Sequence, residues 1–356
     1  MKKEKSYYEA AEQVLPFREL LLSVPRAVAE EAIEIRIRSG RPLVVETRGT
    51  SYLCGTRAAQ PSELEACVQG FCRDSVQSCQ RELSEGCITL RGGHRAGLSG
   101  TAGQAEMIRE YTSVNLRIAR EHIGIADDLF EKTAAQRDFR GLLILGPPLS
   151  AKTTVLRDLC RRIASSKKAA VIDERGELAA VYHGIPQTEI GVNADILTGF
   201  SKSAGIERAI RLLSPEYLIC DEIGADYRSI LRCANRGVKP ILTEHCGSIE
   251  EAGKNAAVRS LVHSGAVNYL ALLGGRGELG QVKKIWRADD GASDSFRFDD
   301  PAVRMDRLYD GGSAQKKNRT ASPFDLHARG DVGADEIPRG IDRRASEDPV
   351  EAALFL

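Results

Sequence analysis

The sequence predicts an α/β fold in which a mostly parallel sheet is covered by helices on both faces, preceded by a smaller α+β domain. From residue 141 onward, short apolar strands alternate with amphipathic helices, as in buried parallel sheets. Before that point, strand-like segments flank a helical stretch, and after Trp286 the apolar periodicity disappears. At 356 residues the chain is long enough for two domains, which we place at 1–118 and 119–286.

The N-terminal α+β domain is predicted from changes in periodicity. Residues 1–38 begin as helix and end in the alternating sequence EIRIR, which indicates a strand, and a Ser-Gly-Arg-Pro turn follows. The stretch 61–83 is predicted to be helical. A second β-rich patch lies at 87–100, where the pair Gly92-Gly93 indicates a hairpin.

The second domain is predicted to contain buried strands separated by amphipathic helices. The helix after the first strand, KTTVLRDLCRRIASS, has its apolar residues on one face and arginines on the other, so the apolar face should cover the sheet. The strands are Leu142–Leu145, Ala169–Asp173, Tyr217–Asp221 and Pro240–Glu244.

The C-terminal segment 287–356 is rich in charge, glycine and serine and has no apolar periodicity. We expect a mostly disordered tail with short ordered pieces at most, because such a composition buries little apolar surface. The terminal VEAALFL is a short apolar stretch that could dock on the folded part.

Composition narrows the classes of function. Lysine plus arginine number 50, as do aspartate plus glutamate, and zero net charge argues against a nucleic-acid coat protein. Aromatic residues make up only 5% of the chain, and the sequence has no stripe of alternating aromatic and basic residues. It therefore gives little support to binding of single-stranded nucleic acid. The sequence contains no apolar stretch of about 18 residues or more, so no membrane-spanning helix is predicted. The N-terminus has no apolar core of a signal peptide.

The nine cysteines are scattered and form no C-x-x-C pair. We expect reduced cytosolic thiols, several of them in the core. The alternative is a zinc site within 54–87, although the spacings there fit none of the common patterns.

The segment GLLILGPPLSAKTT, at 141–154, has the pattern of a phosphate-binding loop with a flaw. Lys152 and Thr153 stand at the spacing of G-x-x-x-x-G-K-[ST], but Ala151 replaces the second glycine. In such a loop, backbone N–H groups wrap the phosphates, the lysine adds a point charge and the next hydroxyl reaches Mg²⁺. The alternative is a chance match before an ordinary helix. The predicted binding residues are Gly146, Pro147, Pro148, Leu149, Ser150, Ala151, Lys152, Thr153 and Thr154.

A partner motif follows in EYLICDE, at 216–222, where an apolar strand ends in two carboxylates. This is the Walker B pattern. Asp221 is expected to hold Mg²⁺ with Thr153, while Glu222 activates the attacking water and Lys152 completes the catalytic set. The alternative is that both acids are simply exposed at the end of a buried strand.

A third strand, ending in ILTEH, could place a polar group beside the γ-phosphate. Thr243 or His245 would then sense hydrolysis. The alternative is a purely structural role for the histidine, and the sequence supports the two interpretations equally.

Together and in this order, the motifs resemble the family of stage III sporulation protein AA, ATPases of endospore-forming bacteria related to the RecA-like traffic ATPases of type II and type IV secretion. The resemblance covers roughly residues 10–286. It is carried by EIRIRSGRPL (34–43), ITLRGGHRAGLSG (88–100), NLRIARE (115–121), VIDERGELA (171–179), AIRLLSPEYLICDEIG (209–224) and ANRGVKPILTEH (234–245).

The resemblance implies a RecA-like P-loop core that uses ATP and Mg²⁺. It also implies a homo-oligomeric ring, as a hexamer, in the cytoplasm on the mother-cell side of the forespore envelope. The implied partners are membrane proteins encoded beside it, in an assembly similar to a secretion channel.

The chain departs from the family pattern at several positions. The family loop resembles GPPG-x-GKTT, whereas Leu149 and Ala151 stand here at its inner glycines, which serve positive φ or close approach to phosphate. Asn193 stands where the family has an arginine, and Glu244 and Cys246 flank the histidine of the third strand. We expect these departures to cluster around one pocket and to weaken catalysis.

Arginines from a neighbouring ring subunit could stabilise transition-state charge. For each, a salt bridge on a solvated face is the alternative. Two functions therefore remain: an active or weakened ATPase, and a structural ring subunit that has lost hydrolysis. The candidate arginines are Arg95, Arg117, Arg120 and Arg211.

Overall fold

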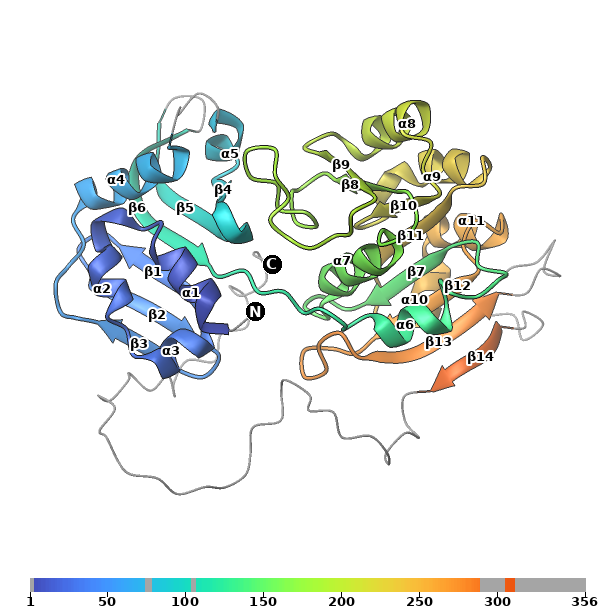
Figure 1. The fold of residues 1–356 in the computed structure, drawn as a ribbon, viewed down its shortest axis with the longest axis horizontal. Helices are drawn as coiled ribbons and strands as arrows, with labels where there is room; N and C mark the ends of the chain where they lie inside the picture. Colours follow the sequence, from blue (N-terminus) through green and yellow to red (C-terminus); the bar gives the residue numbers. More distant parts are fainter. Residues whose placement is uncertain (1–2, 74–78, 104–106, 289–304, 311–356) are drawn as a thin grey trace, which may run out of the picture.

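The computed structural model describes residues 3–73, 79–103, 107–288 and 305–310. These residues form two lobes, each built on its own sheet (Figure 1). The parts of the predicted tail at 289–304 and 311–356, including VEAALFL, lie outside the described residues.

The N-terminal lobe is an antiparallel six-stranded sheet with strand order β3-β2-β1-β6-β5-β4. Its strands are β1 (Ala32–Arg38), β2 (Leu43–Thr47), β3 (Ser51–Cys54), β4 (Cys87–Thr89), β5 (Arg95–Ala102) and β6 (Ile108–Arg117). Its helices are α1 (Lys3–Ala11), α2 (Arg18–Leu22), α3 (Arg26–Glu31), α4 (Pro61–Cys72) and α5 (Gln80–Ser84), with 3₁₀ turns η1 (Leu15–Phe17) and η2 (Arg91–Gly93).

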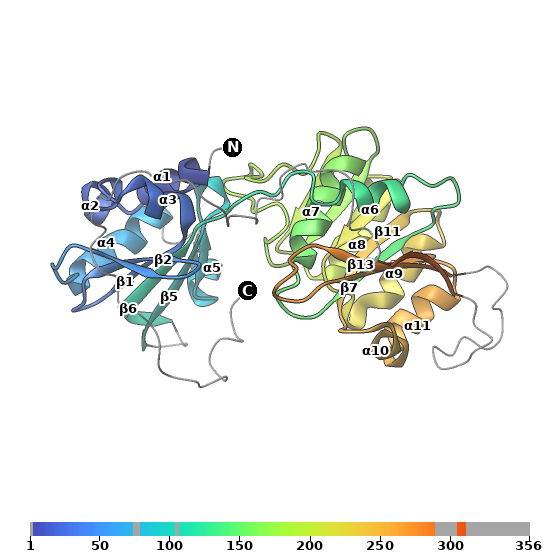
Figure 2. The ribbon, with the colours of Figure 1, turned by 90° about the horizontal axis from the view of Figure 1, so that it is seen from below.

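Helices α1 to α4 lie on one face of this sheet (Figure 2). Alternation along β1 buries Ile35 and Ile37 in the core between sheet and helices. Helix α4 begins at a capping box formed by Gln60 and Glu63. The predicted hairpin is confirmed, because β4 and β5 pair antiparallel and Gly92 turns between them with φ +80°.

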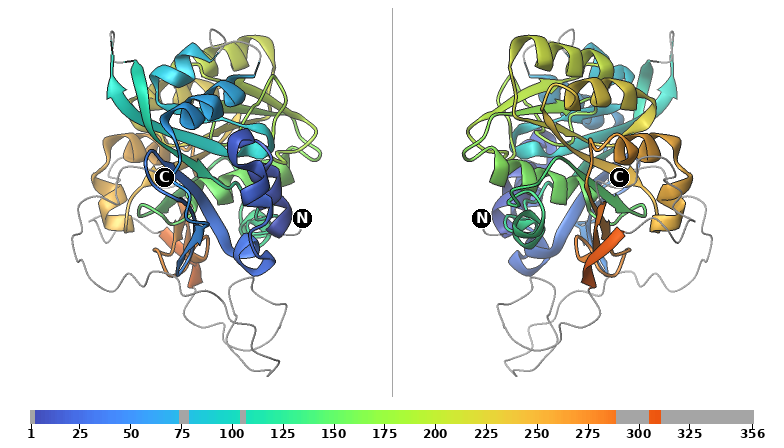
Figure 3. Two further views of the ribbon diagram at one scale, coloured as in Figure 1. Left: turned by 90° about the vertical axis from the view of Figure 1, so that its left-hand side faces the viewer. Right: turned by 90° about the vertical axis from the view of Figure 1, so that its right-hand side faces the viewer.

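The second lobe is an eight-stranded sheet with strand order β14-β13-β12-β7-β11-β10-β8-β9. The strands from β12 to β9 pair in parallel, whereas β13 and β14, orange in Figure 3, pair antiparallel at one edge. The strands are β7 (Leu142–Gly146), β8 (Ala169–Asp173), β9 (Ala194–Thr198), β10 (Tyr217–Cys220), β11 (Lys239–His245), β12 (Tyr269–Leu273), β13 (Val282–Ala288) and β14 (Met305–Asp310).

Helices cover both faces of this sheet, as predicted. Apolar residues of α6 and α7 form the core on one face, and those of α8 to α11 form the core on the other. The helices are α6 (Asp127–Lys132), α7 (Lys152–Ile163), α8 (Lys202–Leu212), α9 (Tyr227–Ala234), α10 (Ile249–Lys254) and α11 (Ala256–His263), with the 3₁₀ turn η4 (Gly224–Asp226) before α9.

All four predicted strands are present in this lobe, with bounds that differ by one residue or less at each end. Strand β14 lies within 287–356, where the sequence predicts short ordered pieces at most. Because β11 pairs with both β7 and β10, the carboxyl ends of these strands meet at one edge of the sheet.

The lobes contact each other where the η2 turn meets the chain after β8. Arg95 pairs with Glu177 at 2.6 Å, and the Gly92 N–H donates to Gln187 Oε1 at 2.8 Å. In the part of the chain that the structure describes, no helix is both long enough and apolar enough to cross a membrane. The nine cysteines are free thiols, and no metal-binding group of three or more His, Cys, Asp or Glu occurs among the described residues.

Candidate nucleotide-binding site

The loop between β7 and α7 adopts left-handed backbone at both departures from the family pattern. Leu149 and Ala151 each have φ +66°. The expectation that these positions require positive φ is therefore confirmed. For an L-residue with a Cβ, left-handed backbone costs about 1–2 kcal/mol per residue, a cost that glycine does not have.

The interior of the loop contains a buried hydroxyl. Ser150 Oγ is buried and has no hydrogen-bond partner among the described residues. It approaches Gly146 so closely that a Cβ at residue 146 would overlap it. The loop is held from outside by Gly280, whose N–H donates to the Ser150 carbonyl at 3.0 Å. A buried unpartnered hydroxyl within a loop at a helix N-terminus fits a phosphate ligand.

Lys152 is buried at the start of α7, and its ammonium is fully engaged. Nζ donates to the carbonyls of Gly146 at 2.8 Å and Pro147 at 2.9 Å. Its third partner is Nδ1 of His245. Burial is the main cause that lowers the pKa of Lys152, opposed by the charges of Asp221 and Glu222.

Asp221 lies directly after β10, where two hydroxyls donate to its carboxylate. Thr153 Oγ1 donates to Oδ2 at 2.8 Å, and the hydroxyl of Thr243 donates to Oδ1. Hydroxyl and carboxylate oxygens are the hard ligands that Mg²⁺ prefers. Thr153 and Asp221, predicted as metal ligands, are therefore brought together by the fold.

Glu222 has an unusual backbone that the surroundings hold in place. Its φ is +52°. Its N–H donates to Thr243 Oγ1 at 2.8 Å, and its carbonyl accepts from the ammonium of Lys202. One carboxylate oxygen forms a hydrogen bond with His245 Nε2 at 3.0 Å, and the other lies 3.5 Å from Arg175 Nη2. A strained residue held by several contacts is typical of a functional site.

Sequence reasoning missed Arg175 and Lys202. Arg175 lies in the loop after β8, which Asp173 fixes by accepting N–H groups from Glu177 at 2.8 Å and Ala179 at 2.9 Å. The signal was available for Arg175, because it follows a parallel strand whose carboxyl end faces the same edge as the loop. Lys202 lies at the start of α8 and has no local signal.

The expected clustering of departures around one pocket is wrong at Asn193. Asn193 bonds the carbonyl of Ala164 through its side-chain amide at 3.1 Å, at the C-terminal end of α7. That is about 18 Å along the helix from Lys152. Glu244 is close enough for its charge to raise the pKa of Lys152, although alternation along β11 places its side chain on the sheet face of Leu242. Burial raises the pKa of Glu244.

Three of the four candidate arginines are engaged within the chain. Arg95 pairs with Glu177 at 2.6 Å, and Arg117 lies 3.8 Å from Glu34. Arg120 donates to the carbonyl of Ala32 at 2.7 Å. Arg211 lies in the last turn of α8 and is exposed. Action across a ring stays a prediction for all four.

Sequence comparison identifies close relatives. The family model for "Sporulation stage III, protein AA" matches residues 7–292. Stage III sporulation protein AA of Bacillus subtilis (strain 168) is 35% identical over 293 residues, which cover 78% of this chain and 94% of that protein.

Structural comparison shows the fold. The Yersinia pseudotuberculosis ATPase DotB matches with TM-score 0.52 and 16% identity, over 76% of this chain and 79% of that one. The pilus retraction motor PilT with bound ADP matches with TM-score 0.52 and 16% identity, over 79% of each chain. The second lobe is therefore a RecA-like P-loop core, and the smaller α+β lobe precedes it.

Proposed function

The chain belongs to the family of stage III sporulation protein AA, and on that premise we propose that it binds ATP with Mg²⁺ at the β7–α7 loop and hydrolyses it. The observation that carries the proposal is the 2.8 Å contact between Thr153 and Asp221, beside Lys152 and Glu222. These side chains come from a phosphate loop and a Walker B strand and meet at one sheet edge.

Each side chain has a distinct task in this proposal. Lys152 exchanges its two carbonyl contacts for phosphate oxygens, and the loop N–H groups and the Ser150 hydroxyl complete the phosphate site. Thr153 and Asp221 hold Mg²⁺, which supplies positive charge against the phosphates. Glu222 orients the attacking water and accepts its proton, with His245 and Arg175 holding the carboxylate. Thr243 and His245 would act as sensors, and their contacts with the Walker B acids support this role.

A second candidate function is a structural ring subunit with impaired hydrolysis. The left-handed backbone at Leu149 and Ala151 favours it, because both side chains add strain in the loop that must wrap phosphate. In either case we propose a homo-oligomeric ring, a hexamer, in the cytoplasm on the mother-cell side, working with membrane proteins of the forespore envelope. Family membership and the fold shared with secretion ATPases support this assembly.

Binding and turnover of Mg²⁺-ATP test the proposal directly. Lys152→Ala should abolish binding, and Glu222→Gln should keep binding and stop turnover. Lys254→Ala, which removes an exposed lysine at the end of α10, is the matched control and should change neither. Absence of binding to an ATP analogue at millimolar concentration would sink the proposal. Binding without turnover that Glu222→Gln leaves unchanged would favour the structural subunit.

A further inference from the structure

The segment between β8 and β9, residues 174–193, contacts the N-terminal lobe and the nucleotide site at the same time. Its Glu177 accepts a hydrogen bond from the guanidinium of Arg95, on β5, at 2.6 Å. Two residues earlier, Arg175 lies 3.5 Å from the carboxylate of Glu222. One stretch of chain therefore joins the first lobe to the residue that is proposed to activate water.

The junction between this segment and the N-terminal lobe is closely packed. Gly93, in the η2 turn, is buried, and a Cβ added there would lie 3.4 Å from Cβ of Ala180 and 3.5 Å from Cβ of Gln187. The neighbouring Gly92 N–H donates to Gln187 Oε1 at 2.8 Å. The N-terminal lobe therefore meets the segment through van der Waals and hydrogen-bond contacts, and the ion pair described above forms beside them.

The turn that carries Arg175 and Glu177 is fixed by the second lobe. Asp173 accepts the Glu177 N–H at 2.8 Å. From α7, Arg157 donates to the carbonyl of Glu177 at 2.6 Å and to that of Leu178 at 2.8 Å. Because the backbone of the turn is held on both sides, the variable feature of this region is the partner that each charged side chain takes.

Arg95 decides which partner Glu177 takes. The two side chains are 28% and 23% exposed, so water screens their charge-assisted hydrogen bond only in part. Without Arg95, the Glu177 carboxylate would lose this partner and lie only two residues from Arg175. The Arg175 side chain is 66% exposed and able to turn towards it. Glu177 would then compete with Glu222 for the same guanidinium.

We propose that Arg95 positions the hydrolytic site by holding Glu177 away from Arg175. Arg175 is thereby left to support the carboxylate of Glu222. Arg95 is a positioning residue, because it acts through other side chains and touches no reacting atom. This role rests on the proposed ATP hydrolysis and adds a regulation of the same site. Separation of the lobes would break the 2.6 Å pair and lower turnover, without altering the phosphate loop.

Substitutions of both members of the ion pair test this role in the full chain. Arg95→Met should lower kcat by about fivefold or more and leave the Kd for an ATP analogue within about twofold, because the phosphate loop is untouched. Adding Glu177→Gln to Arg95→Met should restore kcat to within about twofold of the parent chain, since it removes the competing charge. A purely structural ion pair, or direct action of Arg95 on a neighbouring subunit, predicts no such recovery.

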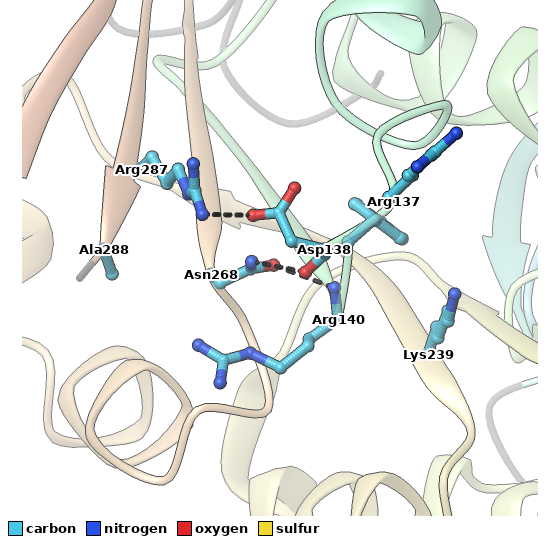
Figure 4. A pocket seen from close by; sticks show the side chains of 8 residues that line it. Arg137, Asp138, Arg140, Lys239, Asn268, Arg287 and Ala288 are labelled. Carbon is cyan, nitrogen blue, oxygen red and sulfur yellow. Dashed lines mark hydrogen bonds and ion pairs between the residues drawn. The ribbon is translucent and has the colours of Figure 1, made fainter. Parts of the chain in front are cut away.

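The ion pair between Arg287 and Asp138 provides the matched control. It also measures 2.6 Å, and Figure 4 shows it with Asn268 and Arg140, which belong to the second lobe as well. It lies at the edge where β7 begins, and the five residues of β7 separate that edge from the phosphate loop by about 16 Å. Arg287→Met should therefore leave kcat within about twofold of the parent value.

The outcomes distinguish this role of Arg95 from the proposed function. Absence of turnover in the parent chain contradicts ATP hydrolysis, and the role falls with it. When the parent turns over ATP, unchanged kcat in Arg95→Met overturns the role alone, as does a loss of kcat that Glu177→Gln fails to restore. An equal loss in Arg287→Met, or loss of ATP-analogue binding in Arg95→Met, also overturns it. Retained affinity for the analogue shows that the second lobe of each variant is folded.

Discussion

Lys152 and His245 share a hydrogen bond of 3.0 Å between the lysine ammonium and the imidazole Nδ1. An ammonium has no acceptor, so Nδ1 must accept and the ring proton lies on Nε2. That nitrogen faces Glu222 Oε1 at 3.0 Å. The histidine therefore connects the lysine of the phosphate loop to the carboxylate that would activate water.

Two substitutions of His245 separate its two contacts. The amide oxygen of Asn can replace Nδ1 as acceptor for Lys152, whereas the amide nitrogen of Gln can replace Nε2 as donor to Glu222. We expect His245→Asn to lower kcat by about tenfold with little change in ATP affinity, and His245→Gln to keep more turnover, since the role lies in positioning Glu222. Equal kcat in the two variants would show that the contact with Glu222 is not used.

Ala151→Gly tests whether the loop is impaired. Glycine removes the strain of φ +66° but gains chain entropy on unfolding, so stability should rise by at most about 1 kcal/mol. ATP affinity and turnover should rise if a Cβ at residue 151 hinders phosphate. Ser214→Gly is the matched control, because Ser214 has φ +46° and lies outside the loop. It should change stability alone. Unchanged turnover after Ala151→Gly would mean that the loop already tolerates alanine.

The sequence predicts most of the phosphate site, because its parts carry local signals. The apolar run of β7, the spacing to Lys152 and the acidic end of β10 each specify a strand end, and parallel pairing brings those ends together. Lys202 was missed because it contacts the Glu222 carbonyl, which lies 20 positions away in the sequence. The residues on either side of Lys202 form no motif that would have indicated this contact.

Other elements escaped prediction for physical reasons. Strand β13 has the sequence VKKIWRA, whose lysines and arginine conceal a strand next to the edge of the sheet, in which Ile285 is the residue buried in the core. Asn193 was placed at the phosphate site because its motif departs from the family there. A motif position does not give a location in space, and Asn193 lies at the other end of α7.

Lys202 is predicted to position Glu222. Its ammonium donates to the Glu222 carbonyl, and this contact supports a residue with φ +52°. We expect Lys202→Met to lower kcat by about tenfold while the Kd for ATP stays within about twofold, because Lys202 bonds the backbone of Glu222 and no loop atom. Lys202→Arg retains a donor and should recover part of kcat. A parallel loss of ATP binding and thermal stability, without rescue by arginine, would indicate a purely structural role.

His94 should make stability depend on pH. It is 1% exposed, Nδ1 accepts from the Ala119 N–H at 3.0 Å, and Nε2 is buried without a partner among the described residues. Burial, with a smaller effect of Arg91, lowers the pKa of His94 from 6.5 to about 4. Between pH 4 and pH 6.5, His94 therefore binds a proton in the unfolded chain but not in the folded chain. The contribution of neutral His94 to the free energy of unfolding is complete above pH 6.5 and is lost as the pH falls towards 4.

The loss should amount to about 3 kcal/mol in the free energy of unfolding. His94→Asn keeps an acceptor for the Ala119 N–H but does not titrate, so urea unfolding at pH 7 and pH 4 should show the parent chain losing about 3 kcal/mol relative to this variant. His263→Asn removes an exposed histidine of α11 and is the matched control. If the parent and His94→Asn lose stability in parallel, His94 is protonated in the folded chain. The burial of its unpartnered Nε2 would then not govern the acid sensitivity of the N-terminal lobe.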